Sequence, residues 1–305
     1  MSASEPYPVS TYHDDKGRSF GYVHIRHPGS SGLGIHFSAF FGAWGDAKPY
    51  RDNFRGYFHR LKMLGSNPAH DWLFLCDTYG AFENGTYYTG EPGDLFVERA
   101  MEAIIRHTLD EGDYARSQAV TVGSSMGGTA AIKFALTLDL AGIVAICPHI
   151  DLDTSALHQD RIAEVAFICP DGDALGEQNW HLTRQIRDLV TARSPERVLP
   201  ALFIQSARDD VGVHAEQVLP LISEWRAHGG TAFLDERERG GHTSDYATGP
   251  LLHDAVDHLL EGKAIDITVY QADPAFAGAV TTPPLSHRLR RRASLFRKRV
   301  RGLFS

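Results

Sequence analysis

Short apolar runs alternate with longer amphipathic segments along most of the chain. Runs rich in Val, Ile, Leu and Phe end at glycine, proline or polar residues, as buried strands do. Between them, apolar residues recur three and four positions apart, which is the spacing of a helix with one buried face. Strands are expected at 20–26, 33–38, 72–77, 119–123, 142–147, 200–207 and 231–235, and helices at 50–64, 96–109, 129–136, 180–190 and 251–260. This alternation predicts an α/β fold around a mostly parallel sheet.

The strand at 119–123 leads into the motif Gly-Ser-Ser-Met-Gly, and a helical run follows it. Strand, tight turn and helix form the context in which Gly-x-Ser-x-Gly presents a nucleophilic serine, so Ser125 is the candidate nucleophile. Gly123 and Gly127 flank it, because larger side chains there would collide across the turn. The alternative is a turn rich in serine and glycine that has no chemistry.

A serine hydroxyl becomes a good nucleophile only when a base takes its proton and an acid orients that base. In folds that carry this motif, the order along the chain is serine, acid, histidine. Asp209 follows the strand at 200–207 and is the preferred acid, while His242, in a loop behind two glycines, is the predicted base. Three further carboxylates compete for the role of the acid: Asp210, Asp171 and Asp173.

The negative charge that develops on an attacked carbonyl oxygen needs backbone donors. Met126 begins the predicted helix, so its N–H is the first candidate for such an oxyanion hole. In folds that carry the Gly-x-Ser-x-Gly turn, the loop after an earlier strand supplies a second donor, and the strand at 33–38 is the candidate here. The N–H of Ala39 or of Phe40 is therefore the second candidate, although a glycine-rich turn packed by aromatic residues is an equal alternative.

Composition and charge narrow the class of protein. The 305 residues are 43% apolar and 22% charged, which is typical of a soluble globular protein. Residues 285–305 hold eight basic residues and no acidic one, so the remaining chain, with 22 basic and 38 acidic residues, carries −16. Such an acidic body repels nucleic acid, whereas the basic tail attracts polyanions. No apolar run is as long as a membrane span, and the first residues lack the order of a signal peptide, so a cytoplasmic protein is expected.

Neither a metal nor a cofactor is predicted. The cysteines, Cys76, Cys147 and Cys169, end apolar runs without the spacing of zinc ligands, and are expected to be reduced core residues. The sixteen histidines are scattered. The glycine-rich stretch at 29–34 precedes a strand, whereas a dinucleotide-binding loop precedes a helix, which argues against an oxidoreductase.

From about residue 20 to 260 the chain resembles the α/β-hydrolase superfamily, through Gly-Ser-Ser-Met-Gly-Gly at 123–128, the strand end Ser-Ala-Arg-Asp209 and Gly-Gly-His242. The resemblance implies an α/β-hydrolase fold with an eight-stranded, mostly parallel sheet flanked by helices. More narrowly, Phe-Ser-Ala at 37–39, Asp-Thr-Tyr-Gly at 77–80, Tyr-Tyr-Thr-Gly at 87–90 and Cys-Pro-His at 147–149 look like the accessory-secretory acetyltransferase-like branch, which implies bacterial cell-surface glycans. Ala39 stands where that branch often has glycine.

Four regions are expected along the chain. Residues 1–18 are predicted to be a loose lead-in and 19–270 the hydrolase domain. Within that domain, 149–198 is a cap or insertion, and 271–305 is a linker with a basic amphipathic tail. Apolar residues at near-helical spacing between the arginines of 285–305 are typical of a segment that lies on an anionic membrane surface. A solvated tail, or one docked on the acidic body, is the alternative.

Taken together, the sequence predicts a serine hydrolase that acts on an ester or thioester through an acyl-enzyme formed by Ser125, Asp209 and His242. Water as the second nucleophile makes an esterase, and a sugar hydroxyl on a cell-surface glycan makes an O-acyltransferase. The aromatic loop at 79–90 follows a strand end, where it either binds a sugar or acyl group or only packs. The alternative from a different functional class is a non-catalytic scaffold that the basic tail recruits to the inner face of the membrane.

Overall fold

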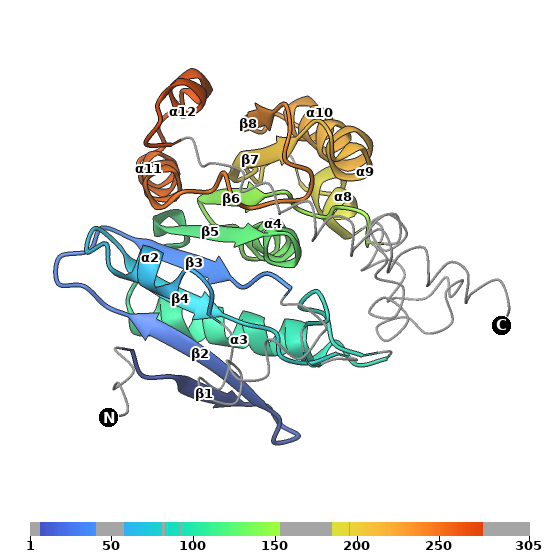
Figure 1. The fold of residues 1–305 in the computed structure, drawn as a ribbon. Coiled ribbons are helices and arrows are strands. Elements are labelled where there is room, and N and C mark those ends of the chain that lie inside the picture. Colours follow the sequence, from blue (N-terminus) through green and yellow to red (C-terminus); the bar gives the residue numbers. More distant parts are fainter. Residues whose placement is uncertain are drawn as a thin grey trace, which may run out of the picture.

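The chain is described here by a computed structural model that covers residues 7–40, 58–80, 83, 85–91, 93–152, 185–194 and 196–276. In this part of the chain eight strands form one sheet in the order β1-β2-β4-β3-β5-β6-β7-β8 (Figure 1). The strands are β1 Ser10–His13, β2 Ser19–Ile25, β3 Leu33–Phe37, β4 Asp71–Leu75, β5 Ala119–Ser124, β6 Gly142–Ile146, β7 Ala201–Ala207 and β8 Ala232–Arg237. Strand β2 runs antiparallel to β1 and β4, and the other neighbouring pairs are parallel. The predicted α/β class and the eight-stranded, mostly parallel sheet are confirmed.

Helices cover both faces of the sheet because the strand residues alternate between two apolar cores. In β4, Leu73 and Leu75 face one core, while Trp72 and Phe74 face the other. The first core is closed by α3 Phe96–Glu111, α4 Met126–Leu138, α8 Gln185–Thr191 and α10 Leu219–Ala227. The second is closed by α2 Leu61–Gly65, α11 Gly249–Leu260 and α12 Ile267–Ala272. Both layers are visible in Figure 1.

Several predicted boundaries differ from the observed ones. The lead-in expected over 1–18 contains β1, whose backbone pairs with β2 from Ser10 opposite Tyr22 to His13 opposite Ser19. Of the helix expected at 50–64, the described residues contain only the short α2 at its end. Most of the cap expected at 149–198 lies outside the described residues, as do Asp171, Asp173, Cys169 and the tail at 285–305.

The parallel strands point their carboxyl ends to one edge of the sheet, and that edge carries the predicted site. Ser125 directly follows β5, and its N–H donates to the carbonyl of Ile146 at the end of β6 at 2.9 Å. The N–H of Cys147 donates in turn to the carbonyl of Gln205 in β7 at 2.7 Å. These bonds continue the sheet beyond its regular strands and fix the loops that follow β5, β6 and β7 against one another.

Candidate active site

Ser125 stands on the turn between β5 and α4 in a strained backbone conformation. Its φ is 53° and its ψ −122°, a combination that non-glycine residues rarely adopt. The residue is 9% exposed, while its neighbours Ser124 and Met126 are 1% and 0% exposed. Such strain is typical of the turn that lifts a nucleophilic serine above a parallel sheet.

The glycines at 123 and 127 are required by close backbone contacts, as the sequence predicts. A Cβ on Gly123 would lie 2.0 Å from the carbonyl oxygen of Gly127. A Cβ on Gly127 would lie 2.2 Å from the carbonyl oxygen of Phe37. Both obstacles are backbone atoms, which cannot turn aside as a flexible side chain would.

His242 joins the serine to a carboxylate. Its Nε2 lies 2.8 Å from Ser125 Oγ, and its Nδ1 lies 3.1 Å from Asp210 Oδ2. The three side chains come from the loops after β5, β8 and β7, which meet at the carboxyl edge of the sheet. This is the hydrogen-bonded order of nucleophile, base and orienting acid.

The carboxylate against His242 is that of Asp210, whereas the sequence analysis prefers Asp209. Asp209 accepts hydrogen bonds from the N–H groups of Gly240 at 3.1 Å and Gly241 at 2.7 Å. These glycines have φ values of 140° and 60°, which bend the chain just before His242. Asp209 therefore holds the loop that carries the histidine, and Asp210 contacts the ring itself.

The two candidates for the second oxyanion donor are in different situations. Ala39 N–H donates to His59 Nδ1 at 3.3 Å, so it is already engaged. Burial, reinforced by the neighbouring Arg60 charge, lowers the pKa of His59 to about 3, which keeps the ring neutral and able to accept. The structure thus shows what the N–H of Ala39 contacts, and both Ala39 and Phe40 stay candidates for the second donor.

Met126, the first candidate donor, is the first residue of α4. The N–H groups in the first turn of a helix have no acceptor within the helix and lie at the positive end of its dipole. The N–H of Met126 follows Ser125 directly, where it can meet an oxyanion formed on a group that the serine has attacked.

Residues 85–90 of the aromatic loop after β4 are packed inside the protein. The buried Asp77 carboxylate accepts bonds from the N–H groups of Thr86 and Tyr88 and from the Thr86 hydroxyl. Tyr88 is fully buried and its hydroxyl donates to the Ser38 carbonyl at 2.9 Å, while Tyr87 is 3% exposed. The sequence leaves open whether this loop binds a sugar or acyl group or only packs. Tyr87 and Tyr88 pack, and neither offers a surface to a sugar.

Two further residues lie at the site, and the sequence motifs gave neither of them a role there. His149, in the loop after β6, stacks on His242, and Arg60 Nη1 donates to Ser124 Oγ at 2.7 Å, one residue from the nucleophile. The Cys-Pro-His sequence contains His149, but nothing in its spacing from His242 tells that the two rings meet. Arg60 precedes α2 in the left-handed conformation, a feature without a sequence signal.

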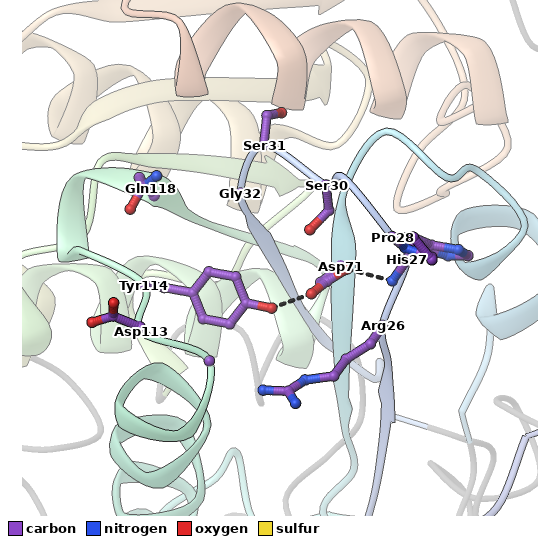
Figure 2. A pocket seen from close by; sticks show the side chains of 11 residues that line it. Arg26, His27, Pro28, Ser30, Ser31, Gly32, Asp71, Asp113, Tyr114 and Gln118 are labelled. Atoms are coloured by element: carbon purple, nitrogen blue, oxygen red, sulfur yellow. Dashed lines mark hydrogen bonds between the residues drawn. The ribbon is translucent and has the colours of Figure 1, made fainter.

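A cavity of about 580 Å³ lies at the other edge of the sheet (Figure 2). Its lining includes Gly32, Asp71 and Gln118, which lie at the amino ends of β3, β4 and β5. The carboxylate of Asp71 is engaged there by the Tyr114 hydroxyl and by the His27 N–H. Since Ser125 follows the carboxyl end of β5, this cavity and the predicted site lie at opposite ends of the parallel strands.

Within the described residues, no group of three or more histidine, cysteine or acidic side chains is arranged to hold a metal. Cys76 and Cys147 are buried, and neither forms a disulfide within the described residues. None of the described helices combines the length and the apolar character that crossing a membrane requires.

No protein-family model matches the sequence, and no curated protein matches it. Solved structures do match. The capsule O-acetyltransferase of Neisseria meningitidis serogroup A is similar over 86% of this chain and 95% of its own, with 15% identity and a TM-score of 0.60. The fluorophosphonate-binding serine hydrolase FphF of Staphylococcus aureus is similar over 83% and 98%, with 14% identity and a TM-score of 0.60.

A third similar structure is the Glycosylation Associate Protein (Gap123) complex of Streptococcus agalactiae, which matches over 88% of this chain and 47% of its own, at 14% identity and a TM-score of 0.57. At these identities the likeness concerns the fold. The chain has the α/β-hydrolase fold.

Proposed function

We propose that the protein is a serine hydrolase or acyltransferase that forms an acyl-enzyme on Ser125. The observation that carries the proposal is the unbroken line from Ser125 Oγ through His242 to Asp210, with contacts of 2.8 and 3.1 Å. A line of this kind on a strained turn at the carboxyl edge of the sheet is what acyl transfer requires.

In the proposed first step, Ser125 Oγ attacks the carbonyl carbon of an ester or thioester while His242 Nε2 takes the hydroxyl proton. Asp210 accepts the Nδ1–H bond and stabilises the imidazolium. The oxyanion is held by the N–H of Met126 and by a second N–H, that of Ala39 or Phe40. When the intermediate collapses, the bond from the carbonyl carbon to the leaving group breaks and His242 gives the proton to that group.

In the second step an acceptor R–OH attacks the acyl-enzyme, His242 takes its proton, and Ser125 is released with that proton. Water as acceptor yields a carboxylic acid, and a sugar hydroxyl yields a new ester. The likeness to the capsule O-acetyltransferase is the reason to keep the sugar as the alternative acceptor. A variant of that enzyme has been solved with CoA, so acetyl-CoA is the first acyl donor to test.

The decisive experiment is labelling of the purified protein by a fluorophosphonate probe, with Ser125→Ala, His242→Ala and Asp210→Asn beside the wild type. Such probes react with an activated serine. We expect strong labelling of the wild type and none of Ser125→Ala. A folded wild type that does not react would contradict the proposal and favour the non-catalytic scaffold.

Hydrolysis and transfer are separated in a second assay. The acyl-enzyme is formed from acetyl-CoA or a p-nitrophenyl acetate, and free acetate is compared with acetylated product in the presence of oligosaccharide acceptors. An esterase releases acetate at the same rate with and without the sugar. A transferase releases it slowly in water and forms the sugar ester when an acceptor is present.

A further inference from the structure

The ring of His149 lies flat against the ring of His242. The two centroids are 4.5 Å apart and the ring planes differ by 10°, which is a stacked pair. His149 is completely buried, whereas the His242 side chain is 19% exposed. A ring without exposed surface does not meet a substrate, so any effect of His149 on the reaction passes through His242.

The backbone around His149 is fixed from two sides. The hydroxyl of Thr129, one turn into α4, donates to the His149 carbonyl at 2.8 Å. Gln217 Oε1 accepts from the N–H groups of Ile150 and Asp151, both at 2.8 Å, while its Nε2 donates to the Gly212 carbonyl at 2.8 Å. Gln217 thereby ties the loop that follows β6 to the loop that carries Asp210.

The ring of His149 is held on its other side by Tyr87. The Tyr87 hydroxyl and His149 Nδ1 are 3.2 Å apart in a buried contact. Tyr87 belongs to the loop that the Asp77 carboxylate anchors, and its φ of 54° shows that the loop imposes its position. The His149 ring therefore contacts a second loop in addition to the ring of His242.

The same loop also contacts the segment after His242. Cys147 Sγ donates to the carbonyl of Thr243 at 3.2 Å. Residues 147–149 thus meet the loop of the catalytic base twice, once at its backbone and once at the ring face.

We propose that His149 is a positioning residue for His242, with its ring as a fixed aromatic platform under the catalytic imidazole. This inference rests on the proposed function, in which His242 serves Ser125. The platform keeps the ring plane in which Nε2 points at Ser125 and Nδ1 at Asp210. It also places an aromatic face against a ring that becomes a cation during the reaction, and such a face stabilises a cation.

Several ionisable groups of the described structure lie around His242 and its loop and can influence the pH profile of labelling. Asp210 lies at Nδ1, His149 on the ring face and Cys147 below Thr243, while Asp209 holds the two glycines before the ring. The His149 variants described next change only the His149 ring and leave the other three groups in place.

The test compares His149→Leu with His149→Phe in fluorophosphonate labelling rates measured from pH 5 to 9. Leucine keeps an apolar contact of similar size but removes the aromatic face, whereas phenylalanine keeps the face and loses the contact with Tyr87. We expect His149→Leu to label about 3- to 30-fold more slowly than the wild type. The pH midpoint of its profile moves down by roughly half to one unit, because the imidazolium loses stabilisation.

His149→Phe is expected to keep the wild-type midpoint, and Tyr87→Phe, which leaves the stack in place, to keep it as well. His70→Leu is the matched control. It removes another buried histidine, bonded to Asp257 and situated just before β4 at the opposite edge of the sheet. This control is expected to change stability without moving the profile.

A His149→Leu variant that is folded and has the wild-type rate and midpoint overturns the inference, and so does a His149→Phe variant that shifts as far as His149→Leu. A wild type that does not label overturns the proposed function instead. The two failures are therefore distinguishable, since the inference is judged only in a protein whose Ser125 reacts.

Discussion

Asp209 and Asp210 are consecutive, yet their carboxylates serve different parts of one loop. Asp210 meets the ring of His242, while Asp209 meets the backbone of Gly240 and Gly241. The partners of the two carboxylates do not overlap, since one contacts backbone N–H groups and the other an imidazole ring. Two adjacent acids thus divide the positioning of one histidine.

Replacing these acids separately tests that division. We expect Asp210→Asn to lower the rate of fluorophosphonate labelling by on the order of 10³-fold or more, as the loss of the orienting acid does in a serine triad. Asp209→Asn, whose amide oxygen still accepts from a backbone N–H, is expected to have a much smaller effect. A larger loss in Asp209→Asn than in Asp210→Asn would restore Asp209 as the acid.

His59 gives a second prediction at the scale of one residue. Its pKa is about 3 in the folded protein because it is buried beside Arg60, whereas an unfolded histidine titrates near 6.5. Between these values the unfolded chain binds one more proton, so the free energy of unfolding falls with acidification by up to about 1.4 kcal/mol per pH unit.

In His59→Gln this contribution is absent, while the amide oxygen can still accept from Ala39. Urea unfolding between pH 4 and 7 is therefore expected to show a shallower acid slope for His59→Gln than for the wild type. Equal slopes would mean that His59 titrates alike in both states. Burial by tertiary packing is what lowers this pKa, and for that reason the sequence does not reveal it.

The limits of prediction at this scale follow from the same contacts. Ser125 and His242 could be chosen as candidates because each belongs to a local pattern, a glycine-flanked turn or a loop behind two glycines, and the structure brings the two side chains into contact. The choice between Asp209 and Asp210 depends on the direction of two side chains after one strand. The contact that the N–H of Ala39 makes depends on His59, twenty residues away along the chain.

At the scale of elements, the turn from β5 to α4 is the most constrained piece of backbone described here. Gly123 faces the carbonyl of Gly127, and Gly127 faces the carbonyl of Phe37, the last residue of β3. The turn is thus wedged between its own helix and the neighbouring strand. The motif predicts this crowding because a tight strand-to-helix turn has no room for a Cβ.

Alanine substitutions in this turn are expected to differ by position. Gly123→Ala and Gly127→Ala each force a backbone shift and are expected to cost about 3 kcal/mol or more and to abolish labelling. Gly128→Ala, whose Cβ would meet Pro148 at 3.2 Å, is the milder comparison. Thermal unfolding measures the loss of stability, and probe labelling measures the loss of reactivity. A Gly123→Ala variant that is fully stable and reactive would contradict the claim that this turn has no room for a Cβ.

The strands of the sheet were predictable from apolar runs, because a buried parallel strand is apolar on both faces. Strand β1 was not, since Ser10–His13 is largely exposed and its residues form no apolar run. Its conformation comes from the backbone bonds of β2. An edge strand of this kind is defined by its partner and leaves little trace in composition.

At the scale of the whole molecule, charge is divided unevenly between body and tail. The eight basic residues of 285–305 contrast with the −16 of the remaining chain. We propose that the tail binds anionic membrane surfaces, to which each basic residue contributes on the order of 1 kcal/mol. The support for this proposal is the sequence pattern.

Removal of residues 285–305 is expected to abolish co-sedimentation with vesicles that contain phosphatidylserine and to leave the labelling of Ser125 unchanged. Binding of the full chain is expected to weaken as salt is raised. A variant with Arg290, Arg291 and Arg292 changed to Gln is expected to bind the vesicles more weakly than the full chain and more strongly than the chain without its tail. Equal sedimentation with and without the tail would exclude it as the membrane contact.

The direction of the parallel strands has one more consequence. All the proposed chemistry lies at their carboxyl ends, and the turn at 27–31 leads into their amino ends beside the cavity of Figure 2. Gly29 in that turn has a φ of 80°, which strains any side chain, so the exposed Pro28 beside it is the position for a substitution. A fluorophore or a surface linker attached at Pro28 would report on the protein, or immobilise it, from the end of the strands opposite to Ser125.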